Sequence, residues 1–132
     1  MSENYYKDLE RVRIERAGEL VTEAEELLLK GLYKSANNRA FYAIEKAIKA
    51  LLANIKTDAE THNGAVKLFN YHFVHNGEGI FTPGDYKMII KADQIRNASD
   101  YDDFYIASKE ESRVQVENAG YIVEKVKQFL GY

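Results

Sequence analysis

Cysteine is absent from the 132 residues, which excludes disulfide bonds and thiolate metal ligands. Proline occurs once and glycine eight times, and long stretches contain neither, which favours helices over a turn-rich β fold. No apolar run approaches the ~20 residues of a membrane span, and the first residues, MSENYYKDLERVR, are too polar for a signal peptide. We therefore expect a cytoplasmic protein that does not enter a membrane.

The sequence also has no excess of positive charge. The formal net charge of −3 argues against a protein whose whole surface binds nucleic acid, and no DNA sequence readout is expected. The content of 45% hydrophobic and 30% charged residues is typical of a globular protein. The length suits a single domain, over residues 1–132, with one continuous core.

What the sequence does contain is helical periodicity. Apolar residues recur at intervals of three and four, which predicts an all-α fold, a five-helix, mostly antiparallel, up-and-down bundle. The expected helices cover residues 4–30, 35–55, 57–75, 83–96 and 108–130. Gly31 is the expected stop of the first helix. The expected N-terminal caps are Ser35, Thr57 with Glu60, Thr82 with Asp85, and Ser108 with Glu111.

The fourth expected helix is apolar on two sides. Ile89 and Ile90 lie on one side, and Met88 and Ile95 lie on another. Such a helix is central in its bundle or lies against a second subunit.

The stretch from Gln94 to Tyr105, QIRNASDYDDFY, is unusually dense in aspartate and aromatic residues. If the helix continues past Arg96, this arginine shares a face with Asp93 and Asp100. One interpretation is a structural ion-pair network. The other is a guanidinium that contacts phosphate through its fork of donors, although the neighbouring aspartates would repel a polyanion.

A basic stripe lies on the second expected helix. Arg39, Lys46, Lys49 and Lys56 fall within about a quarter turn of its surface. The stripe is interpreted either as a solvated helix face or as a groove for nucleic acid or an acidic partner.

The three histidines give little sign of a metal site. His72 and His75 lie three apart on one helix, but no third ligand stands at a helical offset. His62 is expected in the first turn of its helix as a capping or packing group. We predict no metal and no cofactor.

Three segments occur in the order that the HEPN superfamily shows. They are ANNRAFYAIEKAIKALL from Ala36, THNGAVKLFNYHFV from Thr61 and RNASDYDDFY from Arg96. The chain resembles in particular a small prokaryotic branch that is often encoded beside a minimal nucleotidyltransferase. The resemblance implies a helical bundle and a homodimer in which the arginine motifs of the two subunits face each other.

Catalytic HEPN proteins resemble metal-independent ribonucleases that carry arginine and, four to six residues later, histidine. The histidine transfers protons and the arginine stabilises the phosphorane. Arg96 matches the arginine, but Tyr101 stands where the histidine would be, and no histidine follows His75. A phenol with a pKa near 10 is a poor general base at neutral pH compared with an imidazole near 6.5.

Three functional hypotheses follow. We favour a degenerate or non-catalytic domain that binds RNA, a nucleotide or a nucleotidyltransferase partner, within a toxin–antitoxin type of system. The alternative is a toxin-like ribonuclease that uses Arg96 with Tyr101. By family analogy, Tyr101 or Tyr105 is a third kind of site, an acceptor of nucleotidyl groups from the partner. Phosphate or nucleic acid would be bound by Arg96, Arg39, Lys46 and Lys49.

Overall fold

The protein is all-α. The computed structural model describes residues 3–132, and within them there are five α-helices and no strand. The elements are α1 (Glu3–Leu29), α2 (Tyr33–Asn54), α3 (His62–Phe69), the π-helical segment η1 (Asn70–His75), α4 (Pro83–Tyr101) and α5 (Lys109–Leu130). The fold class predicted from periodicity is confirmed. No described helix combines the length and the apolar character that a bilayer span requires.

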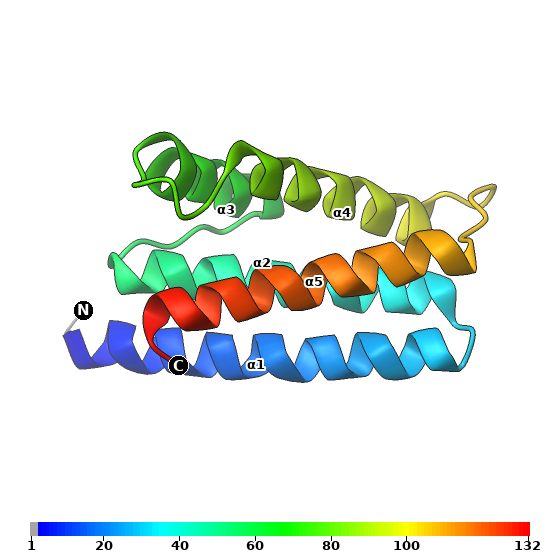
Figure 1. Cartoon of the computed structure of the whole chain (residues 1–132), viewed down its shortest axis with the longest axis horizontal. Coiled ribbons are helices and arrows are strands. Elements are labelled where there is room, and N and C mark those ends of the chain that lie inside the picture. Colours follow the sequence, from blue (N-terminus) through cyan, green and yellow to red (C-terminus); the bar gives the residue numbers. More distant parts are fainter. Residues whose placement is uncertain (1–2) are drawn as a thin grey trace.

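The helices lie in three tiers (Figure 1). α1 forms one outer tier, α2 and α5 the middle tier, and α3 with α4 the other outer tier. α1 and α2 run in opposite directions, as do α4 and α5, while α2 and α5 run the same way. The loops after α1 and after α4 therefore meet at one end of the bundle.

The central helix is α2, not α4. α2 packs against α1, α3, α4 and α5, and its alanines allow the neighbouring helices to approach it from several directions. α4 packs mainly on α2 and buries Ile89 and Ala92, and Met88 and Ile95 line a groove between α4 and α5. Of the two alternatives for the fourth helix, the central position is therefore wrong, because the small residues of α2 let more helices pack against it. The alternative, that this helix lies against a second subunit, stays a prediction.

Two expected helix starts are wrong, and both have a local cause. α2 begins at Tyr33 rather than after Ser35, directly after Gly31, which has the predicted left-handed conformation (φ 74°). α3 begins after Thr61, whose hydroxyl accepts from the Gly64 N–H, rather than after Thr57. The Asp58 carboxylate instead accepts two hydrogen bonds from Arg13, which holds this segment outside the helix.

The predicted stop of the third helix at His75 is confirmed, but its second half has π geometry. Residues Asn70–His75 are π-helical, and Phe73 is the buried member of this segment. Single π turns inside helices often occur at functional sites.

The starts of α4 and α5 follow the sequence signals more closely. Thr82 and Asp85 form the predicted capping box. Ser108 caps α5 by accepting from the Glu111 N–H. The Glu111 side chain does not complete a box there, because its carboxylate accepts a hydrogen bond from the Tyr105 hydroxyl.

Candidate functional site

Arg96 lies in the middle of the C-terminal half of α4 and not at a helix end. The helix continues to Tyr101, so Asp93 and Asp100 flank Arg96 on one face. Arg96 Nη2 donates to Asp93 Oδ1 at 2.6 Å, and Nη1 lies 3.8 Å from Asp100 Oδ2. Both predicted ion pairs are therefore formed. Only the expected helix end at Arg96 is wrong, because no breaker interrupts the α4 hydrogen bonds before Asp102.

The Arg96 side chain is buried against an aromatic ring. The residue is 5% exposed, and its guanidinium carbon lies 5.2 Å from the centre of the Phe41 ring on α2. Burial acts to lower its pKa, but Asp93, Tyr42 and Asp100 outweigh it and raise the pKa above its ordinary value. Arg96 Nε is buried and has no hydrogen-bond partner among the residues that the structure describes. The ion pair with Asp93 therefore uses Nη2 and leaves the Nε–H without a hydrogen bond.

Arg96 lines a cavity of about 390 Å³ between α4 and the start of α3. We call it the Arg96 cavity. Side chains with amide, hydroxyl, imidazole and carboxylate groups make up most of its wall. They are Thr61, His62, Asn63, Asp93, Gln94, Arg96 and Asn97. The wall therefore presents both hydrogen-bond donors and hydrogen-bond acceptors, and the charge of Arg96 is paired with Asp93.

His62, the first residue of α3, is held by a buried carboxylate from α2. Its Nδ1 contacts Glu45 Oε2, and Glu45 is buried. The imidazole also meets the edges of the Phe41 and Tyr42 rings, with centroid distances of 5.6 Å in each case. His62 and Arg96 therefore flank the same Phe41 ring, and both line the Arg96 cavity.

Sequence reasoning missed this pairing. His62 was expected to cap or pack, and Glu45 was not considered as a site residue. A signal was present, because Glu45 is the one acidic residue between Lys30 and Lys56, a segment otherwise rich in basic residues. Its partner stands 17 positions further along the chain, in another helix, so no local spacing connects the two residues.

Tyr101 does not share the Arg96 cavity. It lies five residues after Arg96, so the two side chains leave α4 about 140° apart. Tyr101 is 73% exposed and lines a separate recess with Lys34, Asn38 and Arg39. Within one chain, the phenol is therefore not placed beside the arginine that sequence spacing pairs with it.

Tyr105 is partly buried, and its hydroxyl donates to the Glu111 carboxylate. Burial, and then the contact with Glu111, raise its pKa to about 12. The two candidate tyrosines therefore differ strongly in access. Of these two tyrosines, Tyr101 is the exposed one.

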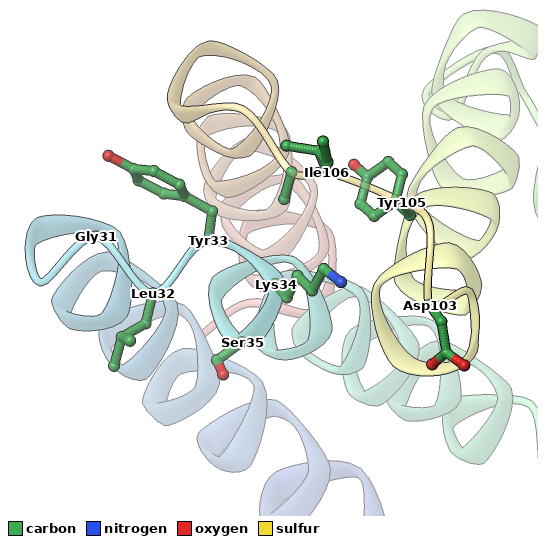
Figure 2. A pocket seen from close by; sticks show the side chains of 9 residues that line it. Gly31, Leu32, Tyr33, Lys34, Ser35, Asp103, Tyr105 and Ile106 are labelled. Carbon is green, nitrogen blue, oxygen red and sulfur yellow. The ribbon is translucent and has the colours of Figure 1, made fainter.

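A further recess, of about 550 Å³, lies at the end of the bundle where the loops after α1 and α4 meet. Figure 2 shows Tyr33 and Lys34 from the start of α2 on one side of it, and Tyr105 and Ile106 from the loop before α5 on the other. Lys34 Nζ lies 6.0 Å from the centre of the Tyr105 ring. Beside this recess the loop exposes two large apolar side chains, since Phe104 is 94% and Ile106 is 88% exposed.

The basic stripe is only partly accessible. Three of its four residues, Arg39, Lys46 and Lys49, lie on α2 and are half-buried, because α2 is the central helix, whereas Lys56 lies beyond the end of α2 at Asn54. Arg39 Nε donates to Glu23 at 3.2 Å, so one of the three charges is neutralised. Lys46 and Lys49 form no ion pair with any residue in the described range 3–132. A phosphate-binding role for the stripe stays a prediction.

His72 and His75 lie on the π-helical segment, where the His75 ring stacks on Tyr71. No group of three histidine or carboxylate side chains gathers as a metal site within residues 3–132.

Residues 11–129 match the family described as "HEPN domain". The chain belongs to the HEPN domain family. The resemblance of the three sequence segments is thereby confirmed, and the match covers all five helices in part or in full.

Several archaeal proteins are similar over most of their length. Two from Methanocaldococcus jannaschii are each named a "putative toxin". One is 28% identical over 98% of this chain and 86% of the relative, and the other is 32% identical over 89% and 85%. A "UPF0332 protein" of Archaeoglobus fulgidus is 29% identical over 88% of this chain and 90% of the relative. This HEPN domain protein is thus related to two proteins that are each named a "putative toxin".

Proposed function

We propose that this HEPN domain binds single-stranded RNA or a free nucleotide, with one nucleotide unit in the Arg96 cavity. The observation that carries the proposal is the wall of this cavity, which combines the amides of Asn63, Gln94 and Asn97 with the imidazole of His62 and the side chain of a buried arginine, Arg96. Unstacked bases are recognised by such groups, through hydrogen bonds to amides and contact with histidine or arginine planes.

The electrostatics of the cavity support a nucleotide more than a long polyanion. Asp93 and Asp100 balance the charge of Arg96, so the cavity does not create a broad positive field. A ligand therefore gains mainly from hydrogen bonds and from one local cation. Its volume of about 390 Å³ lies toward the small end of the range of ligand pockets.

Binding of a labelled 2′-O-methyl oligonucleotide, followed by fluorescence anisotropy, tests the proposal. Because about one cation faces the ligand, we expect a shallow salt dependence, with a slope of log K against log salt near −1. Asn97→Asp should weaken binding about fivefold or more by adding a carboxylate to the cavity. Asn76→Asp, which adds the same charge in an exposed turn, is the matched control and should change the affinity less than twofold.

Two results would contradict this assignment. Equal effects of Asn97→Asp and Asn76→Asp on the affinity would show that the ligand does not bind in the Arg96 cavity. A slope of about −2 or steeper would indicate several phosphate contacts, and the Arg39, Lys46 and Lys49 stripe would become the better candidate.

A second candidate function is supported by the exposure of Tyr101. We propose that a nucleotidyltransferase partner modifies this residue, because its hydroxyl is accessible whereas the Tyr105 hydroxyl is held by Glu111. Intact mass after co-expression with the partner tests this. We expect one nucleotidyl addition that Tyr101→Phe abolishes and Tyr105→Phe preserves. An unchanged mass of the wild-type protein would refute it.

The homodimer stays a prediction that rests on the family resemblance. The apolar groove of about 600 Å³ between α4 and α5, with Met88, Ile95 and Val114 in its wall, is the surface we propose for the second subunit. Light scattering after size-exclusion chromatography should give a dimer mass for the wild-type protein and a monomer mass for Val114→Glu. A monomeric wild-type protein at micromolar concentration would contradict the prediction.

A further inference from the structure

One wall residue of the Arg96 cavity, His62, belongs to a carboxylate–histidine pair that the motif spacing does not reveal. Glu45 on α2 contacts Nδ1 of His62 on α3. When the carboxylate accepts the Nδ1 proton, the neutral imidazole keeps its lone pair on Nε2. Phe41 and Tyr42 pack against the ring and limit its rotation. A histidine with one nitrogen held by a carboxylate has the arrangement of a general base.

Nε2 is the nitrogen that remains for a ligand. It makes no hydrogen bond with any described residue, and the His62 side chain is 40% exposed where it lines the cavity. A histidine with a purely structural role at this position would need only the Glu45 contact and the two ring contacts. A structural role does not require that His62 also face a cavity, so the cavity is a second observation in favour of a ligand at Nε2.

Positive charge for a phosphate is provided from two sides. Arg96 carries a positive charge, and its side chain lines the same cavity. The N-terminus of α3 lies there as well, since Thr61, His62 and Asn63 are cavity residues and start this eight-residue helix. A helix N-terminus favours an anion through its free N–H groups and its dipole.

We propose that His62, positioned by Glu45, is the general acid–base group of an RNA-cleaving site in the Arg96 cavity, with Arg96 as the group that stabilises charge on the phosphate. The proposal rests on nucleotide binding at this cavity. It places the proton-transfer group in another helix, upstream of Arg96, rather than at Tyr101.

The reaction is a transesterification that needs no oxidant or reductant. His62 Nε2 removes the proton of the 2′-hydroxyl, and the 2′-oxygen forms a bond to the adjacent phosphorus. The bond from phosphorus to the 5′-oxygen of the next nucleotide breaks. The resulting imidazolium returns its proton to that 5′-oxygen, so the products are a 2′,3′-cyclic phosphate and a 5′-hydroxyl. Arg96 offsets the negative charge that develops on the equatorial oxygens.

The test is cleavage of labelled single-stranded RNA in the presence of EDTA. We expect the wild-type protein to give 2′,3′-cyclic phosphate ends. His62→Gln should lower kcat about 100-fold or more, the scale of a lost general acid–base group, while KM changes less than threefold. His72→Gln, a histidine on the π-helical segment, is the matched control and should retain the wild-type rate.

Glu45→Gln provides a second variant in case His62→Gln does not fold, as judged by thermal unfolding. The amide no longer holds the Nδ1 proton as a carboxylate does, so kcat should fall about tenfold or more with His62 still present. Binding of 2′-O-methyl RNA, which lacks the attacking hydroxyl, should persist in the folded His62→Gln and Glu45→Gln proteins. A merely structural role for His62 would instead change stability and binding together.

The outcomes separate the two proposals. Wild-type protein that binds 2′-O-methyl RNA but leaves unmodified RNA intact overturns the His62 proposal and preserves nucleotide binding. Cleavage by His62→Gln at the wild-type rate also overturns it. Absence of both binding and cleavage refutes both.

Discussion

Replacement of Arg96 by methionine tests whether the arginine has the structural role that its contacts indicate, in addition to any ligand role. The substitution keeps a long side chain over the Phe41 ring but removes a buried charge that contacts Asp93 and Asp100. Breaking a buried pair costs about 3–5 kcal/mol when one charge is left behind. The Asp93 and Asp100 side chains are each 22% exposed, so water can partly solvate the carboxylates that Arg96→Met leaves unpaired. We therefore expect a loss of unfolding free energy at the lower end of this range, about 3 kcal/mol.

Urea denaturation followed by circular dichroism measures this loss. A loss of about 3 kcal/mol corresponds to a fall of roughly 10 °C in the melting temperature of a domain of this size. A double-mutant cycle with Asp93→Asn should give a coupling of about 1 kcal/mol or more, because that carboxylate is the uncompensated charge in Arg96→Met.

Arg11→Met is the matched control, because Arg11 pairs with Asp8 on the exposed face of α1. Exposed pairs contribute little, so the control should lose less than about 1 kcal/mol. If Arg96→Met is no more destabilising than Arg11→Met, or if the coupling with Asp93 is absent, the structural interpretation of the network is refuted.

Three further predictions concern stability. Asp85 is buried and accepts from Lys125 at 2.6 Å, so Asp85→Asn should cost about 3 kcal/mol at pH 7 in urea denaturation. Burial opposes ionisation of Asp85, but Lys125, Thr82 and Tyr121 lower its pKa. The difference between wild type and variant should therefore be full above about pH 4 and disappear as the pH falls through the lowered pKa, and a pH-independent difference would contradict this. Gly31→Ala should cost about 1 kcal/mol because φ is 74° there, in the left-handed region. Gly18→Ala should stabilise α1 by about 0.5–1 kcal/mol, since an added Cβ meets no atom within 4 Å, and equal thermal shifts for the two glycine variants would refute both.

The helix count and most helix ends follow from local signals in the sequence. Gly31 terminates α1, Thr82 with Asp85 starts α4, and Ser108 caps α5, because each of these interactions is completed within a few residues of the chain. The choice of central helix does not follow from such signals. Apolar residues on two sides of α4 predict a helix that is central or lies against a second subunit. The alanines of α2 instead allow its neighbours to pack closely around α2, and how closely two helices pack depends on the side chains of both helices.

Sequence alone determined that this is a helical protein and that Arg96 has aspartate neighbours, because helical periodicity and i, i+3 and i, i+4 spacing are properties of a single helix. The HEPN family followed from the resemblance of three segments and from the family match over residues 11–129. Only the tertiary structure decided which groups surround Arg96. The packing of α3 and α4 against α2 brings His62, which Glu45 contacts, to the Arg96 cavity and leaves Tyr101 in another recess. The physical reason is that a side chain five residues along a helix points to a different face, whereas a residue from a neighbouring helix can meet it directly.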